Sequence, residues 1–321
     1  MGEDTGIGSR ASGIGRGSAR PIPDARDPIP ATLGTLVDAL APVLAHAGIA
    51  EARAEARDLV AAVAGQPRLW PTVHRDEPAD PELVEGAARA AERRSRGMPF
   101  AYAVGRASFR HLTLDVDERV LIPRQETEVL VDEVLAAVAR AGLGPGGVAV
   151  DVGTGSGAIA LALACEGRFD RVVATDVSLD ALDVARVNAA HSRRAMCAPV
   201  EFRHGSLLAP LRDPAAPVRA RAVVSNPPYI AFAEADALPA SVRDWEPAVA
   251  LFAGDGGMAA IAALVREAAP VLEPGGLLAM EVDARRASDA AALVAGDGRY
   301  AGVAVRLDLA GRERFVLATL A

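Results

Sequence analysis

Hydrophobic residues recur with a helical period over the first hundred residues of the chain. Leu40 and Leu44 share one face of a helix that should stop at Gly48. Asp80-Pro81 is typical of a helix N-cap followed by proline at the first helical position. The pattern therefore predicts a small domain of three or four short helices over residues 31–98.

After the helical domain, the hydrophobic residues alternate with polar ones instead of recurring with a helical period. Strict alternation over Leu112–Val116 predicts a half-buried strand, which we expect to pair with Arg119–Ile122 in a β-hairpin linker at residues 99–122. Pro123–Glu128 then opens a helix with an apolar face.

From Val148 onward, short apolar runs alternate with helical segments, which favours a parallel doubly wound sheet. The last two runs leave no room for a helix between them, so we expect them to form an antiparallel C-terminal hairpin. The predicted fold class is α/β, with a seven-stranded Rossmann-like sheet over residues 123–321 beside the N-terminal all-helical domain. The predicted strands are Val148–Val152, Arg171–Thr175, Val200–His204, Arg221–Ser225, Leu277–Val282, Val303–Asp308 and Arg314–Thr319.

The segment Asn226-Pro227-Pro228-Tyr229 follows one of these strands. Two prolines cannot donate ladder hydrogen bonds, so the strand must end in a rigid turn. The Asn226 side-chain oxygen and the Pro227 carbonyl are two acceptors that can hold a planar NH2 group, and Tyr229 offers a ring face for stacking. Orienting an NH2 group in this way assists a neutral amine or amide acting as a nucleophile, so we predict that Asn226, Pro227 and Tyr229 are catalytic and that Pro228 also contacts substrate.

A second motif is glycine-rich. It starts at the end of the first strand of the sheet and opens a helix, and it contains Asp151, Gly153, Thr154, Gly155, Ser156 and Gly157. The glycines let backbone approach a ligand closely, and their spacing differs from that of dinucleotide-binding loops. Asp176 ends the next strand, where a carboxylate can accept both ribose hydroxyls, although capping the helix at Ser178 is an alternative role. We therefore predict a nucleoside-binding loop.

Composition narrows the remaining classes of function. The 321 residues are 51% hydrophobic with a net charge of −8, which argues against a protein that works by gripping phosphate backbones. Cys165 and Cys197 have no metal-ligand spacing, and the five histidines are scattered, so we predict no metal site. No run of eighteen apolar residues occurs, and we expect a cytoplasmic protein without a membrane segment. Residues 1–30 are rich in Gly, Ser, Arg and Pro and predict a disordered tail; their acidic residues weaken the alternative of an organelle transit peptide.

Taken together, these motifs resemble S-adenosylmethionine-dependent methyltransferases of class I, and more narrowly the HemK/PrmC-type protein-glutamine N5-methyltransferases. The narrower resemblance rests on Leu121–Glu128, on Trp245-Glu246-Pro247 with Gly254–Gly257, and on Asp308–Arg312. It covers about residues 31–321.

The resemblance implies a function and further roles. S-adenosylmethionine would be the cofactor, and the substrate would be the glutamine of the Gly-Gly-Gln loop of a peptide-chain release factor, docked with help from the helical domain. Phe109 would pack against the cofactor, and Asn226 would contact the cofactor as well as the substrate. Gly205-Ser206 stands where related enzymes carry an acid near the adenine, so Ser206 or backbone is expected there; Val282-Asp283 also departs from the family pattern.

Alternatives remain open from the sequence. A nucleic-acid amino-methyltransferase would use the same Asn-Pro-Pro-aromatic turn, but it should also show a basic, aromatic-bearing recognition region, which this chain lacks. A ribosomal protein could carry the acceptor glutamine, and the chain could be a catalytically weak binding protein. We expect a monomer that forms no stable complex with nucleic acid.

Overall fold

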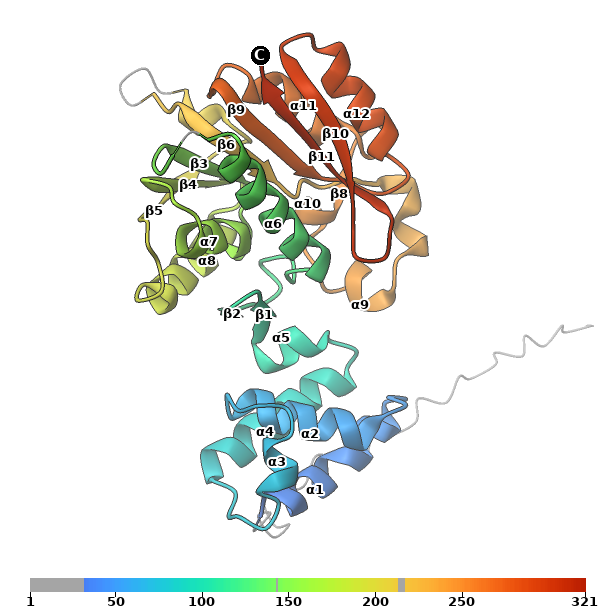
Figure 1. Ribbon diagram of the computed structural model, residues 1–321. Helices are drawn as coiled ribbons and strands as arrows, with labels where there is room; N and C mark the ends of the chain where they lie inside the picture. Colours follow the sequence, from blue (N-terminus) through green and yellow to red (C-terminus); the bar gives the residue numbers. More distant parts are fainter. Residues whose placement is uncertain (1–31, 143, 213–216) are drawn as a thin grey trace, which may run out of the picture. The chain divides into compact units, whose positions relative to one another are not determined.

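The computed structural model describes residues 32–142, 144–212 and 217–321, and the predicted N-terminal tail lies outside these ranges. The chain divides into two compact units, one up to Arg96 and one from Gly97 onward (Figure 1). The first unit contains the predicted helices, and Asp80 caps the last of them by accepting a hydrogen bond from the Glu82 N–H at 2.8 Å. The first two helices, which carry buried leucines, both contact the fourth helix, which carries buried alanines. The helices are α1 (Leu33–His46), α2 (Ala52–Val63), α3 (Trp70–Val73) and α4 (Pro81–Ser95).

The second unit is built on a seven-stranded sheet with the order β10-β11-β9-β6-β3-β4-β5. Strands β3 to β6 and β9 are parallel, and β11 runs antiparallel to both β9 and β10. The predicted α/β sheet with its antiparallel C-terminal hairpin is therefore confirmed. Its strands are β3 (Val148–Val152), β4 (Arg171–Asp176), β5 (Val200–His204), β6 (Ala220–Ser225), β9 (Leu272–Glu281), β10 (Tyr300–Leu307) and β11 (Glu313–Leu320).

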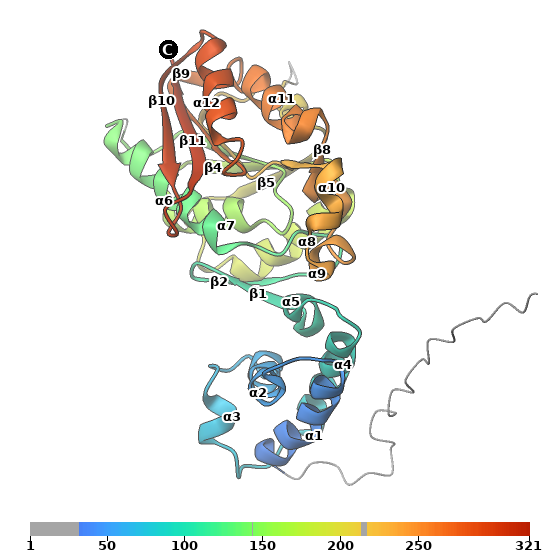
Figure 2. The same ribbon diagram turned by 90° about the vertical axis from the view of Figure 1, so that its right-hand side faces the viewer.

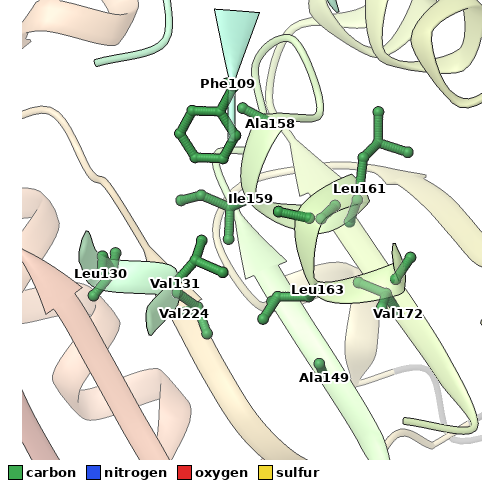
Figure 3. Packing of buried hydrophobic residues seen from close by; sticks show 14 of the residues in the cluster. Phe109, Leu130, Val131, Ala149, Ala158, Ile159, Leu161, Leu163, Val172 and Val224 are labelled. Atoms are coloured by element: carbon green, nitrogen blue, oxygen red, sulfur yellow. The ribbon is translucent and has the colours of Figure 1, made fainter. Parts of the chain in front are cut away.

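Helices cover both faces of this sheet, as Figures 1 and 2 show for α6 and for the pair α11 and α12. Alternate residues of the central strands β3 and β6 enter two separate cores. Ala149 and Val224 join the core under α6 and α7, which Figure 3 shows, whereas Val150 and Val223 join the core under α11 and α12. The near-continuous apolar strands follow from this burial on both faces. The covering helices are α6 (Gln125–Arg140), α7 (Ala158–Glu166), α8 (Leu179–Ser192), α11 (Ala259–Ala268) and α12 (Ala287–Gly296).

The predicted hairpin linker pairs differently from the expectation. The strand β2 (Leu112–Asp115) is present, but its partner is the preceding β1 (Arg106–Phe109), and no strand forms at residues 119–122. Arg110 makes the turn with φ +53°, and its guanidinium donates to Glu166 at 2.6 and 2.7 Å and to Asp132 at 2.8 Å. A short helix, α5 (Phe100–Val104), precedes the hairpin.

Short elements connect β6 to α11. Strand β7 (Ile230–Ala231) pairs in parallel with β8 (Phe252–Ala253), which ties the turn after β6 to the segment after Trp245-Glu246-Pro247. The remaining elements are α9 (Ala240–Arg243), α10 (Ala248–Leu251) and the 3-10 turns η1 (Ala209–Leu211), η2 (Phe232–Ala237) and η3 (Asp255–Gly257). Across the described ranges, no helix is long and apolar enough to cross a membrane.

Candidate active site

One row of paired residues aligns the ends of the central parallel strands. Val152 of β3 pairs with both Thr175 of β4 and Ser225 of β6, and Ser225 pairs in turn with Met280 of β9. The Ser225 hydroxyl also donates to the Val152 carbonyl at 2.8 Å. The glycine loop, Asp176, the Asn-Pro-Pro-Tyr turn and Glu281 therefore begin side by side. Since β3 and β6 lie where the strand order reverses, this edge is the place where open α/β sheets bind ligands.

The glycine loop turns sharply away from β3. Gly153, Gly155 and Gly157 have φ values of +73°, +54° and +86°, a region that residues with a Cβ rarely adopt. The N–H groups of Gly153 and Thr154 both donate to the Thr175 carbonyl, at 2.9 and 3.0 Å. No atom lies within 4 Å of the Cβ position at Gly153 or Gly155, so the loop borders open space where a ligand can approach the backbone.

Asp151 fixes this loop from inside the sheet. Its Oδ2 accepts from the Thr154 hydroxyl at 2.6 Å and from the Ala160 N–H at 3.0 Å, while its Oδ1 is buried without a partner among the described residues. Burial raises the pKa of Asp151 to about 7, and the nearby Asp176 adds to the shift. The side chain therefore supports the loop rather than lining open space.

Asp176 is placed differently. Its Oδ2 accepts the Gly155 N–H and its Oδ1 accepts the Ser178 N–H, each at 2.9 Å, and the residue keeps 9% of its surface exposed. A carboxylate has about four lone-pair sites, so the two bonds leave capacity for a ligand's hydroxyl groups. The capping role at Ser178 and a ligand-binding role are thus compatible.

The end of β5 closes the other side of this region. The Gly205 N–H donates to the Asp176 carbonyl at 2.9 Å, and the exposed Ser206 follows directly. Ser206 is therefore the residue next to Gly205, whose N–H binds the Asp176 carbonyl. Phe109, in contrast, is fully buried and points toward Ala158 and Ile159 at the start of α7 (Figure 3), so its predicted contact with the cofactor stays a prediction.

The Asn-Pro-Pro-Tyr turn carries a buried chain of polar side chains. The Asn226 amide donates to the Thr127 hydroxyl at 3.1 Å, and Thr127 donates to Glu281 at 2.7 Å. Tyr229 donates weakly to the other Glu281 oxygen at 3.4 Å. Burial raises the pKa of both Glu281 and Tyr229. The contact with Thr127 leaves Asn226 Oδ1 without a hydrogen bond in the described part of the chain.

A cavity of about 220 Å3 opens at this turn. Asn226, Tyr229 and Arg124 are among the residues that line it. Arg124 is held by Glu246, whose two carboxylate oxygens lie 2.6 and 2.7 Å from Arg124 Nη2. Burial raises the pKa of Glu246, while the Arg124 charge opposes that shift. The other lining residues are Leu121, Pro227, Ile230, Leu238, Val242, Ala250 and Leu251.

Several of these partners were absent from the residues predicted to form the site. The hydrogen-bond chain at the turn includes Thr127 and Glu281. The cavity is lined in part by Arg124, which pairs with Glu246. A carboxylate that ends a buried parallel strand, as Glu281 does, was a usable signal in the sequence. Elsewhere, the described residues contain no cluster of His, Cys, Asp or Glu able to hold a metal ion.

Comparison with known proteins agrees with this arrangement. The family model of the PrmC N-terminal domain matches residues 35–105, and that of the methyltransferase small domain matches residues 125–240. The catalytic domain of hMettl16, solved in complex with the MAT2A 3'UTR hairpin 1, shares the fold at a TM-score of 0.53 and 15% identity, over 74% of this chain and 80% of that chain. The fold and the matched domains define a methyltransferase.

Closer relatives identify its family. The release factor glutamine methyltransferase of Moorella thermoacetica is 40% identical over 289 residues, covering 86% of this chain and 94% of that protein. The enzyme of the same name from Mycolicibacterium smegmatis is 39% identical over 294 residues, covering 89% and 97%. The chain belongs to the release factor glutamine methyltransferase family.

Proposed function

We propose that this enzyme methylates the side-chain amide nitrogen of a glutamine in a peptide-chain release factor, within its Gly-Gly-Gln motif. S-adenosylmethionine is the methyl donor. The observation that carries the proposal is the Asn226 amide, whose NH2 group is held by Thr127 while its Oδ1 has no hydrogen bond among the described residues, and which lines a cavity together with Pro227.

The strand ends fit the cofactor. Gly153 and Gly155 leave room for a nucleoside and an amino-acid group against the backbone, and the Asp176 carboxylate has free lone pairs for the ribose hydroxyls. The loop is held in shape by Asp151, Thr154, Ser156 and Gly157, and Phe109 supports the start of α7. We assign the adenine contact to Ser206, which is exposed directly after β5. When bound, S-adenosylmethionine supplies an electrophilic methyl group on its sulfonium.

The turn fits the acceptor amide. A glutamine NH2 presents two protons, and Asn226 Oδ1 and the Pro227 carbonyl are two acceptors on one rigid segment. Bonds from both protons orient the nitrogen and favour the partial positive charge that develops on it during methyl transfer. Amide nitrogen is barely basic, so catalysis rests on positioning, and Tyr229 with Pro228 confines the planar group.

The partner assignment rests on further features. The relatives' names specify a release factor, and the helical unit over residues 32–96 carries no motif for chemistry, which suits a docking role. The net charge of −8 supports a protein substrate over a nucleic-acid one. We further propose that the enzyme acts as a monomer in the cytoplasm, where translation takes place.

The test is transfer of a labelled methyl group from S-adenosylmethionine to a purified release factor. We expect label on the intact factor, none on a factor whose Gly-Gly-Gln glutamine is changed to alanine, and none with the Asn226→Ala enzyme. Binding of S-adenosylhomocysteine should survive in Asn226→Ala, since the glycine loop and Asp176 are untouched. Label on ribosomal protein or RNA, with none on the release factor, would refute the proposed substrate.

A further inference from the structure

Asparagine is a nearly symmetric side chain, and its use in the proposed reaction depends on which end faces the cavity. The oxygen accepts hydrogen bonds and the NH2 group donates them, yet the two ends have almost the same shape. With the NH2 group toward the cavity, Asn226 would repel the NH2 group of a substrate amide. The fold must therefore specify the orientation.

The hydrogen-bond chain behind Asn226 provides that specification. Thr127 has one hydroxyl proton and donates it to Glu281 at 2.7 Å. An ionised carboxylate only accepts, so Thr127 has nothing left to offer Asn226 except a lone pair. The end of Asn226 that contacts Thr127, at 3.1 Å, must then be its NH2 group, and Oδ1 is left for the cavity.

Burial makes this chain selective. Glu281 is 1% exposed and Thr127 is 4% exposed, so water has little access to either as an alternative partner. The groups facing Glu281 come from three places in the fold: Thr127 and Glu126 on α6, Tyr229 in the turn after β6, and Arg314 on β11. Burial and Glu126 raise the pKa of Glu281, whereas Thr127, Tyr229 and the Arg314 charge favour its ionised form.

We infer that Thr127 and Glu281 are positioning residues that set the polarity of Asn226, so that its side-chain oxygen faces the acceptor amide. The inference rests on the proposed function, since it concerns the group that holds the glutamine. It assigns a role to a helix residue and a strand-end carboxylate that never need to touch either substrate.

Substitutions of Thr127 test this role. Thr127→Val keeps the side-chain shape and removes the hydroxyl, whereas Thr127→Ser keeps the hydroxyl. Thr319→Val is the control, because the Thr319 hydroxyl likewise donates a hydrogen bond within the fold, to the Ala301 carbonyl at 3.2 Å, but lies near the end of β11. Each purified variant is assayed for kcat and KM with the release factor, for S-adenosylhomocysteine affinity and for Tm.

We expect Thr127→Val to lower kcat by about 10- to 100-fold, the scale of losing correct orientation of a reacting group. Its S-adenosylhomocysteine affinity should stay at the wild-type value, Thr127→Ser should recover kcat to within about threefold, and Thr319→Val should match wild type within about twofold. If Thr127→Val does not fold, Thr127→Ala removes the same hydroxyl without adding apolar bulk, and the same comparison applies.

Two results would overturn the inference alone: wild-type transfer with kcat unchanged in Thr127→Val, or equal losses of kcat in Thr127→Val and Thr127→Ser. A merely structural role would lower Tm and cofactor affinity together with kcat, which would also count against it. A wild-type enzyme that transfers nothing to the release factor would overturn the proposed function, and this inference with it.

Discussion

Gly257 lies directly against the backbone of the Asn-Pro-Pro-Tyr turn. It is buried with φ +92°, and a Cβ added there would stand 2.2 Å from the Tyr229 carbonyl oxygen and 2.7 Å from Arg286 Nε. Arg286 cannot easily move away, because it donates to the Gly256 carbonyl at 2.7 Å and to Glu234 at 2.8 Å. Gly257→Ala must therefore displace the backbone at Tyr229.

The size of the displacement follows from the contact. Ordinary van der Waals contact begins at 3.4 Å, so the carbonyl must retreat by about 1.2 Å. A misplacement of about 1 Å at a reacting centre can lower the rate about 100-fold. Gly256→Ala is a matched control: its φ is +61°, which imposes a similar strain of about 1–2 kcal/mol, but no atom lies within 4 Å of its Cβ position.

Steady-state methyl transfer to the release factor, with S-adenosylhomocysteine titration calorimetry beside it, measures the effect. We predict that the kcat of Gly257→Ala is about 100-fold lower than the kcat of Gly256→Ala. The two variants should bind S-adenosylhomocysteine with similar affinity. The reasoning fails if the two variants have equal kcat, or if Gly257→Ala weakens cofactor binding as strongly as it weakens transfer.

Three further predictions concern the charged groups of the site. Asp176→Asn should weaken S-adenosylhomocysteine binding about tenfold or more in calorimetry, because each hydrogen bond to a charged group contributes about 1.5–3 kcal/mol; unchanged affinity would exclude ribose binding by Asp176. The wild-type kcat should fall on the acid side at a pH above the ordinary range of a glutamate carboxyl, because burial raises the pKa of Glu281 and its protonation can reverse the Thr127 hydrogen bond. Glu281→Gln should lack this acid limb, and an identical pH profile in the variant would contradict the reasoning. Asp151 has its pKa raised to about 7, so its contribution to folding is fully present below about pH 4 and is lost as the pH rises toward 7. In calorimetric scans, the Tm of Asp151→Asn minus that of the wild type should therefore increase from pH 4 to pH 8. A difference that stays constant over this range would argue against a raised pKa of Asp151.

The sheet could be predicted because its strands are apolar on both faces. Runs such as Val148–Val152 have no competing helical periodicity, and the structure reproduces that strand residue for residue. That the strand ends lie side by side could also be predicted, since parallel strands bring their carboxyl ends to one edge. The predicted start of β9 was wrong, because the residues Pro274-Gly275-Gly276 are typical of a turn. In the structure the strand begins at Leu272 and continues through these residues, where its pairing with β6 shifts register.

The polar contacts between residues far apart in the chain could not be predicted from the sequence. The hydrogen bond from Asn226 to Thr127 spans 99 positions, and that from Thr127 to Glu281 spans 154, so no local pattern links the three residues. The predicted pairing of β2 with residues 119–122 was wrong for a different reason. Its turn uses Arg110 in a left-handed conformation where glycine is the usual signal, and the ion pairs to Glu166 and Asp132 that offset the strain come from other elements.

The central claim is that the Asn226 turn directs a methyl group to one amide nitrogen. Tandem mass spectrometry of a release factor treated with the enzyme and S-adenosylmethionine tests it most directly. The account predicts a single added methyl group on the side-chain nitrogen of the Gly-Gly-Gln glutamine, absent with Asn226→Ala. A methyl group on an arginine, on the chain terminus or on another glutamine, or an unchanged product from Asn226→Ala, would contradict it.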